Sequence, residues 1–205
     1  FIANPNNPTG TWIDKTTLVD FLNQVPDNVL VILDEAYFEY VEDVSYPDGI
    51  SLLASYPNLI VTRTFSKAYG LAALRVGYAV SHPDIADLMN RIRQPFNVNA
   101  MSLVAAEAAL QDQAYVTQAV QLNKLGMSFL TSACEDFGLG FVPSAGNFLT
   151  IDFGRDAMPI YEDLLAKGVI VRPIGVYEMP NHLRVTIGTA SENERFVETL
   201  KQVLN

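Results

Sequence analysis

The chain has 205 residues, about half of them apolar, which is enough for one large domain, or one and a half small ones, with a buried core. Its net charge of −10 and its pI of about 4.5 argue against a nucleic-acid-binding protein and against docking on an anionic membrane. Cys134 is the only cysteine, so an intrachain disulfide is excluded and a reducing, cytoplasmic compartment is expected.

The start of the chain carries no targeting signal of the secretory kind. FIANPNNPTG lacks the basic region and apolar stretch of a signal peptide, and no apolar run in the chain approaches the ~20 residues that span a bilayer. The chain begins inside a strand-like segment that runs directly into a turn, so we expect the natural protein to have further residues upstream. His82, expected near a helix start, and His182, expected in a loop, lack metal-ligand spacing, so we expect no metal site.

The first part of the chain predicts a mostly parallel sheet. Short continuous apolar runs bounded by turns are typical of strands buried on both faces. The Asn- and Pro-rich segment NPNNPTG (4–10) predicts a loop of defined geometry, and Asp14 is placed to cap a helix that runs to about Val25. The predicted buried parallel strands after this loop lie at 28–33, 59–65 and 76–81.

Helices dominate the middle of the chain, and a second region with strands ends it. Pro83 begins a predicted helix to about Arg93, and Ser191 with Glu194 forms a predicted capping box for the last helix. The remaining predictions are helices at 99–111, 113–136, 156–167 and 191–204, and strands at 147–153, 168–173 and 182–188. We therefore predict three parts: a large α/β domain (1–95), connecting long helices (96–136) and a smaller α+β domain (137–205).

Polar side chains follow three of the predicted strands of the large domain. Asn7 comes a few residues after FIA, Asp34 directly follows VLVIL, and Ser66 with Lys67 follows LIVTRTF. Ligands of open α/β sheets bind at the carboxyl ends of strands. We therefore expect these side chains to converge on one crevice.

A lysine in such a crevice has a specific chemical use, because its amine can attack a carbonyl and form a Schiff base. An aldehyde cofactor with a pyridine ring would also need a carboxylate for its ring nitrogen, an arginine with hydroxyls for its phosphate, and donors for its ring hydroxyl. The candidates are Asp34 for the nitrogen; Arg75, Ser66 and Thr64 for the phosphate; and Asn7 and Tyr37 for the ring hydroxyl. Taken singly, Lys67 also fits a surface lysine, Asp34 a helix cap and Arg75 a surface ion pair; the combination favours the site.

Three motifs carry a resemblance to a known family. NPNNPTG, DEAYFEY and TFSKAYGLAALRVG, in this order, resemble the signatures of fold-type I pyridoxal-phosphate aminotransferases. The resemblance implies that Lys67 is the Schiff-base lysine, that Asp34 pairs with the pyridinium nitrogen and that Arg75 binds the phosphate. It implies that Asn7 and Tyr37 contact the ring oxygen and that Thr64 and Ser66 lie near the phosphate.

The C-terminal stretch narrows the resemblance. The segment GVIVRPIGVYEMPNHLRVTIGT resembles the end of histidinol-phosphate aminotransferases, which implies substrate-binding roles for Arg172 and Arg184 and a position near the substrate for Asn147. The implied reaction converts L-histidinol phosphate and 2-oxoglutarate to imidazole-acetol phosphate and glutamate, in a cytoplasmic homodimer that binds no nucleic acid or membrane. The chain resembles only the C-terminal part of such proteins.

Several alternatives remain open on the sequence. An aromatic amino-acid aminotransferase or a pyridoxal-phosphate decarboxylase of phosphorylated amino acids would use the same scaffold. The effector domain of a transcription regulator would use it without catalysis, and a truncated, inert fragment would carry the same motifs.

Overall fold

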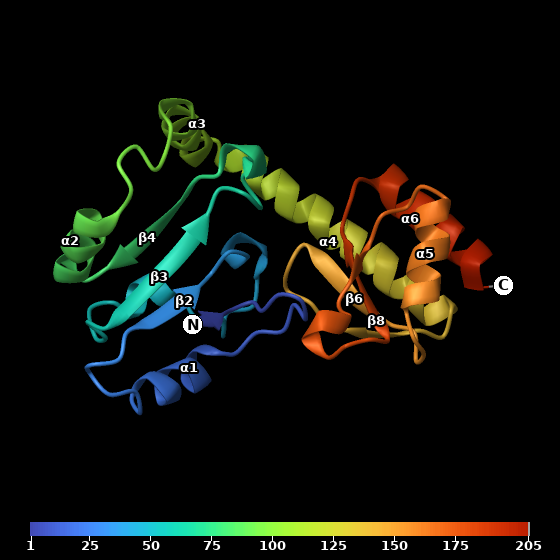
Figure 1. Cartoon of the computed structure of the whole chain (residues 1–205), viewed down its shortest axis with the longest axis horizontal. Helices are drawn as coiled ribbons and strands as arrows, with labels where there is room; N and C mark the ends of the chain where they lie inside the picture. Colours follow the sequence, from blue (N-terminus) through green and yellow to red (C-terminus); the bar gives the residue numbers. More distant parts are fainter. Residues whose placement is uncertain (205) are drawn as a thin grey trace. The chain divides into compact units, whose positions relative to one another are not determined.

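The computed structural model describes residues 1–204, which form two compact units. The first unit comprises residues 1–6 and 12–119, and the second comprises residues 7–11 and the chain from Val120 onward. The NPNNPTG segment is therefore divided between the units. Each unit is built around a four-stranded sheet (Figure 1).

The sheet of the first unit has the order β1-β2-β3-β4, and its first three strands are parallel. Asp34 is the last residue of β2, opposite Thr62 of β3. The parallel core confirms the predicted α/β class, and two of the predicted apolar runs form strands within it. The strands are β1 (Ile2–Ala3), β2 (Val31–Asp34), β3 (Leu59–Thr64) and β4 (Gly77–Ser81).

The direction of β4 corrects the prediction of a third buried parallel strand at 76–81. β4 runs antiparallel to β3, with Thr64 opposite Gly77, and its first three residues are exposed. A parallel return needs a crossover of a dozen or more residues, usually a helix. The connection between β3 and β4, residues 65–76, contains no α-helix to carry the chain across the sheet, only the short 3-10 turn at Ala72–Leu74, and the chain returns antiparallel.

One face of this sheet is covered and buried. Leu33 and Val61 project from it into an apolar cluster that contains Leu18 and Leu22 of α1 (Lys15–Leu22). Because strand side chains alternate, Asp34 and its neighbours in register project from the opposite face. Asp14 caps α1 as predicted, accepting a hydrogen bond of 2.7 Å from Thr17 N, although the helix ends at Leu22 rather than near Val25.

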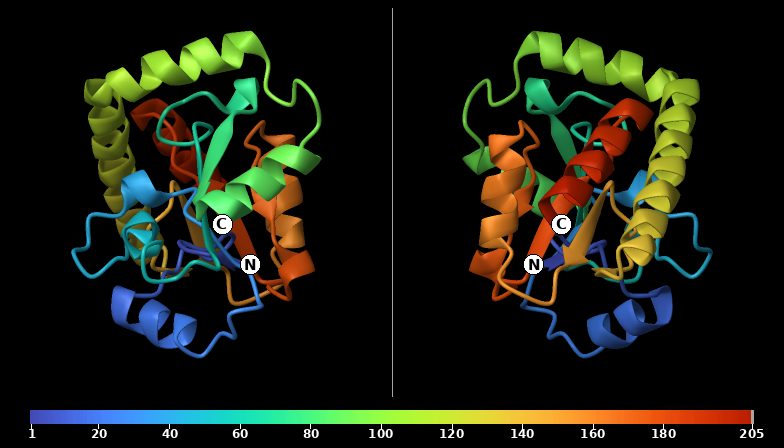
Figure 2. Two further views of the ribbon diagram at one scale, coloured as in Figure 1. Left: turned by 90° about the vertical axis from the view of Figure 1, so that its left-hand side faces the viewer. Right: turned by 90° about the vertical axis from the view of Figure 1, so that its right-hand side faces the viewer.

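Helices follow β4. Pro83 begins α2 as predicted, with His82 as its N-cap, and the chain then passes through Phe96, whose φ of 57° breaks the helical path. Figure 2 shows the sharp turn between α3 and α4. The helices are α2 (Pro83–Ile92), α3 (Ala100–Gln111) and α4 (Gln113–Asp136), and other short 3-10 turns lie at Phe38–Tyr40, Gly49–Leu52 and Gly175–Tyr177. Among residues 1–204, no helix is both long and apolar enough to cross a membrane.

The sheet of the second unit has the order β5-β6-β8-β7 and is antiparallel throughout. Two predictions are corrected here: β7 is much shorter than 168–173, and His182 lies not in a loop but at the start of β8, where the predicted strand 182–188 began. β5 was not predicted. The elements are β5 (Gly140–Val142), β6 (Phe148–Asp152), β7 (Arg172–Pro173), β8 (His182–Thr186), α5 (Met158–Ala166) and α6 (Ala190–Leu204).

The two faces of this second sheet have different partners. Leu149 and Leu183 project into a core formed with α4, α5 and α6. On the other face lies the segment 7–11, because Thr150 Oγ1 donates a 2.5 Å hydrogen bond to Pro8 O. Ala145 N also donates to Gly10 O at 2.9 Å. The helices therefore bury one face, and the loop motif covers part of the other.

The cap of α6 corrects the predicted capping box. Thr189 N donates a 2.7 Å hydrogen bond to Glu192 Oε2, and Glu192 N donates to Thr189 Oγ1 at 3.4 Å. These are the reciprocal bonds of a capping box, so the box is formed by Thr189 and Glu192 and not by Ser191 and Glu194. Both pairs have the required spacing, and the earlier helix start selects the first.

Candidate active site

A pocket of about 410 Å³ lies at the carboxyl ends of β2 and β3. This volume is within the range of small-molecule sites. The structure brings five of the predicted site residues together in its lining: Asp34, Thr64, Ser66, Lys67 and Arg75. An amine, a carboxylate, a guanidinium and two hydroxyls therefore meet in one place, all from the first unit.

The position of Asp34 follows from the sheet. It is the last residue of β2, and its Oδ1 accepts a 3.2 Å hydrogen bond from Ala36 N as the chain leaves the strand. The carboxylate is exposed on the open face of the sheet. It is therefore accessible to a ligand in the pocket.

Lys67 lies in a loop that is closed at its base. Phe65 N donates to Val76 O at 3.2 Å, and Leu71 N donates to Phe65 O at 2.8 Å, so the chain returns to its starting point after Lys67. Its Nζ lies 5.2 Å from the centroid of the Tyr37 ring, which is only 4% exposed. Tyr37 thus adjoins the lysine, as a side chain that reaches the same site.

The loop also rests on α3. Ser102, fully buried, donates a 2.7 Å hydrogen bond to Leu74 O, and Phe65 and Val76 pack with Ala106 in a small apolar cluster. At Gly70 the chain has a φ of +73°, and an added Cβ would lie 2.5 Å from Tyr115 Oη. These contacts hold Lys67 on a defined backbone rather than on a free surface loop.

Arg75 and Ser66 form the cationic end of the pocket. Arg75 Nη1 donates to Ser66 Oγ at 3.4 Å and to Ala72 O at 2.8 Å, and Ser66 N donates to Thr64 Oγ1 at 3.1 Å. Arg75 has a φ of 50°, a left-handed conformation that is uncommon outside glycine and clusters at functional sites. The guanidinium and hydroxyls form a group that suits an anion such as a phosphate.

Sequence reasoning missed a buried ion pair behind this pocket. Arg63 Nη2 lies 2.7 Å from Glu35 Oε2, and the side chains are 10% and 0% exposed. Arg63 also lies 2.7 Å from Asp48 Oδ1, and it belongs to the lining of the pocket, as do Thr62 and Gly77. An acid directly after one apolar strand and an arginine within the next were visible in the sequence, but their pairing depends on the register between the strands.

Burial and the ion pair act in opposite directions on the pKa of each member of this pair. Burial raises the pKa of the Glu35 carboxyl, although the hydrogen bonds from Arg63 and Gly49 act in the opposite direction. Burial alone would lower the pKa of Arg63, but its hydrogen bonds and charge interactions with Glu35, together with the Asp48 charge, raise it. Burial likewise raises the pKa of nearby Glu39 and brings that of Tyr40 to about 12. The carboxyl groups of Glu35 and Glu39 therefore ionise less readily than exposed carboxyl groups.

The remaining predicted residues belong to the second unit. Arg184 Nη1 donates a 2.5 Å hydrogen bond to Asn7 Oδ1, and Arg184 Nε is buried with no hydrogen-bond partner among residues 1–204. Arg172 lies directly opposite Arg184 on the neighbouring strand. Like charges directly opposite on antiparallel strands are destabilising. An unsatisfied donor and two adjacent guanidinium groups are suited to bind an anion.

Asn147 lies just before β6, and its backbone oxygen accepts a 2.9 Å hydrogen bond from Ile187 N. Asn123 of α4 reaches the same turn and donates to Gly146 O at 3.2 Å. Asn147 is therefore anchored by its backbone next to β8, the strand that carries Arg184.

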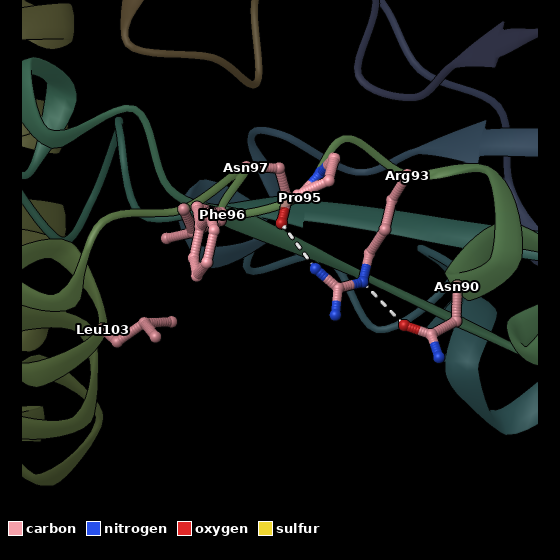
Figure 3. Close-up of a pocket in the computed structure, with 7 residues that line it drawn as sticks. Asn90, Arg93, Pro95, Phe96, Asn97 and Leu103 are labelled. Carbon is pink, nitrogen blue, oxygen red and sulfur yellow. Dashed lines mark hydrogen bonds between the residues drawn. The ribbon is translucent and has the colours of Figure 1, made fainter.

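A second pocket, of about 630 Å³, lies where the chain connects α2 to α3 (Figure 3). Among the described residues that line it, Arg93 alone is ionisable. Its guanidinium donates to Asn90 Oδ1 at 2.6 Å and to Asn97 Oδ1 at 3.2 Å. This pocket has no acid–base pair, so the pocket at the strand ends is the better candidate for an active site.

The sequence matches the family "Aminotransferase class I and II" over residues 1–200. The chain belongs to this family.

Curated relatives in this aminotransferase family are similar over the whole chain. It is 59% identical over 204 residues to histidinol-phosphate aminotransferase 2 of Pseudomonas fluorescens strain Pf0-1, and 56% identical over 203 residues to histidinol-phosphate aminotransferase 1 of Idiomarina loihiensis. These matches cover 100% and 99% of the chain but 55% of each relative. The chain thus spans about half the length of the curated relatives it matches.

A solved structure shares the fold of this aminotransferase chain. Histidinol-phosphate aminotransferase from Sinorhizobium meliloti, in complex with pyridoxal-5'-phosphate, matches with a TM-score of 0.92 and 35% identity. The match covers 98% of this chain and 56% of that one. The fold is therefore that of part of an aminotransferase.

Proposed function

We propose that the protein to which this chain belongs is a pyridoxal-phosphate-dependent aminotransferase that acts on L-histidinol phosphate and 2-oxoglutarate. The observation that carries the proposal is the convergence of Lys67, Asp34 and Arg75 on one pocket at the ends of adjacent strands. The similarity to histidinol-phosphate aminotransferases supports the choice of substrate. The products would be imidazole-acetol phosphate and glutamate.

The residues of the pocket fit this cofactor group by group. When bound, pyridoxal phosphate supplies an aldehyde for a lysine and a pyridinium ring that acts as an electron sink. The guanidinium of Arg75, with Ser66 Oγ and Thr64 Oγ1, would bind the phosphate, since these donors already form one hydrogen-bonded group. Asp34, exposed on the open face, would hold a proton on the ring nitrogen.

Lys67 has two roles in the proposal. Its amine would bind the cofactor aldehyde, and its Nζ would take a proton from the substrate α-carbon. Proton transfer by a positioned side chain typically contributes ~10²–10⁴-fold to the rate. Because two substrates take turns at one site, the kinetics should be ping-pong.

Asn7 and Tyr37 would hold the ring oxygen of the cofactor. Tyr37 already adjoins Lys67 across 5.2 Å from Nζ to the ring centroid. Asn7 accepts a hydrogen bond from Arg184, so its amide is oriented by the residue that we assign to the substrate. We place Asn147, held near β8 by its backbone, beside the substrate.

Arg184 and Arg172 would bind the anionic groups of the substrates. A guanidinium binds either a carboxylate or a phosphate through two parallel hydrogen bonds. The same pair could therefore accept the phosphate of the amino alcohol in one half-reaction and a carboxylate of 2-oxoglutarate in the other. The buried, unsatisfied Nε of Arg184 supports this, because a ligand would complete its hydrogen bonding.

We also propose a cytoplasmic homodimer that takes small-molecule substrates and binds neither nucleic acid nor membranes. The single cysteine and the net charge of −10 support this view. Light scattering of the full-length protein would measure the oligomer.

The test of the proposed function is an assay of the full-length protein with pyridoxal phosphate. Glutamate should form from 2-oxoglutarate with L-histidinol phosphate as donor, faster than with phenylalanine, and without release of CO₂. A higher kcat/KM with phenylalanine would show an aromatic aminotransferase, and release of CO₂ a decarboxylase. Cofactor binding without turnover of any amino donor would favour a non-catalytic sensor.

A further inference from the structure

Two charged side chains lie on the covered face of the first sheet, directly behind the pocket. Asp34 pairs in register with Thr62, and Glu35 N donates a 2.9 Å hydrogen bond to Thr62 O, which extends the contact between β2 and β3 by one residue. Side chains alternate along a strand, so Glu35 and Arg63 project opposite to Asp34 and Thr62. The ion pair between Glu35 and Arg63 therefore links β2 to β3 at the carboxyl end of β2.

The contacts of this pair determine its position in several directions. Glu35 Oε2 accepts hydrogen bonds from Arg63 Nε at 2.9 Å and Nη2 at 2.7 Å, while Oε1 accepts one from Gly49 N at 2.8 Å. The Arg63 guanidinium lies 3.5 Å from the centroid of the Phe38 ring. An added Cβ at Gly49 would lie 2.8 Å from Glu35 Oε1, so the Gly49 backbone lies too close to the Glu35 carboxylate for a larger residue.

Stability alone is a weak reason for such a pair. Charges lose hydration when they are buried, and apolar side chains of similar volume often stabilise a fold equally well. Directional hydrogen bonds differ from apolar contacts because they fix the relative position of two groups. Here the carboxylate belongs to Glu35, the residue directly after Asp34. The guanidinium belongs to Arg63, four positions before Lys67.

We propose that Glu35 and Arg63 are positioning residues that set the spacing between Asp34 and Lys67, the two groups that hold opposite ends of the cofactor ring. This inference rests on the proposed function and adds residues to it that do not touch the substrate. A displacement of about 1 Å at a reacting centre can reduce a rate on the order of 10²-fold. The pair acts by preventing that displacement.

The test uses the full-length protein and compares two ways of losing the pair. The double variant Glu35→Leu/Arg63→Met removes both charges and keeps an apolar filling of similar volume. We expect it to unfold at a somewhat lower urea concentration than the parent, because Gly49 N loses its acceptor. We also expect it to bind pyridoxal 5'-phosphate at least about 10-fold more weakly and to show a kcat lowered on the order of 10²-fold with a smaller change in KM. The absorbance band of the lysine-bound cofactor should also shift.

A conservative variant keeps the test decisive if the double variant does not fold. Arg63→Lys retains the positive charge but cannot make two directed bonds to one carboxylate. It should fold, bind the cofactor more weakly than the parent and show a shifted absorbance band. Both changes should be smaller than in the double variant. The control, Asp87→Asn/Arg91→Gln, removes an exposed ion pair on α2 and should leave affinity, absorbance and kcat unchanged.

The outcomes separate the inference from the proposed function. Variants with parental affinity, absorbance and kcat would overturn the positioning role, even if their stability fell. A parent protein that does not bind pyridoxal phosphate at all would instead overturn the proposed function on which the role depends.

Discussion

The side chains that we propose for the site lie at or just after the strand ends in the first sheet, whereas the two arginines proposed in the second sheet lie within strands. Asp34 ends β2, and Lys67 follows β3 by three residues. Arg184 lies in the middle of β8, between the buried residues Leu183 and Val185. Ligands of a parallel α/β sheet bind at the carboxyl ends of its strands, whereas an antiparallel sheet can leave one whole face open to them. Substitutions in the first sheet should therefore mainly affect cofactor binding and turnover, and those in the second sheet should mainly affect substrate binding.

Replacement of Lys67 should have the largest effect, because this amine is assigned both the covalent bond to the cofactor and the proton transfer. In the full-length protein, Lys67→Ala should abolish the visible absorbance of lysine-bound pyridoxal phosphate and all measurable amino transfer. Lys15→Ala, at the exposed start of α1, is the control and should change neither. Wild-type turnover by Lys67→Ala would show that the lysine is wrongly assigned.

Changes in the second sheet should affect substrate binding more than cofactor binding. Arg184→Gln should raise KM for the anionic substrates about 10–100-fold, since hydrogen bonds to charged groups contribute about 1.5–3 kcal/mol. Arg172 is exposed, so Arg172→Gln should raise KM only about 2–5-fold. Steady-state kinetics and a cofactor titration measure both quantities. Loss of cofactor affinity with an unchanged KM would contradict the assignment of these arginines to the substrate.

Two glycines at corresponding places offer a smaller and well-matched comparison. Gly77 begins β4 opposite Thr64, and an added Cβ would lie 2.7 Å from Arg63 O; Gly140 begins β5, and its added Cβ would lie 3.4 Å from Asp152 Cβ. Gly77→Ala must therefore move backbone and should lower the free energy of unfolding by about 1–3 kcal/mol. Gly140→Ala should be neutral within about 0.5 kcal/mol. Urea denaturation measures both, and equal effects would contradict this close approach at the pocket.

The smallest expected effect concerns the cap of α6. The hydrogen bond from Thr189 N lowers the pKa of the Glu192 carboxyl below its usual 4.5. A lowered folded-state pKa means that this carboxylate stabilises the fold above about pH 4.5 and loses that contribution as the pH falls. Glu192→Gln should therefore be less stable than the parent at neutral pH and approach it in acid. A larger loss of stability in Glu194→Gln than in Glu192→Gln would instead support the predicted capping box of Ser191 and Glu194.

The first sheet was largely predictable because its signals are local. A continuous apolar run that ends in a polar residue predicts both a buried strand and a polar side chain at its carboxyl end, as at Asp34. The direction of β4 was missed because it depends on the connection and not on the strand itself. Residues 65–76 are long enough for a crossover but contain no α-helix, and the strand returns antiparallel.

The pairing of Glu35 with Arg63 could not be predicted, because it depends on the register between β2 and β3. A shift of one residue would turn one of the two side chains to the other face. The cap of α6 shows a similar limit, since Thr189–Glu192 and Ser191–Glu194 match the same pattern and only the backbone distinguishes them. Sequence patterns predicted the pocket well, while side-chain partners across strands needed coordinates.

The most direct test of the account is to locate the covalent bond to the cofactor. The full-length protein would be loaded with pyridoxal phosphate, reduced with borohydride, digested and mapped by mass spectrometry. The account predicts that the pyridoxyl mass is found on the peptide that contains Lys67, and that Asp34→Asn weakens loading without moving the label. A label on any other lysine, or no label under conditions where the protein transfers amino groups, would contradict it.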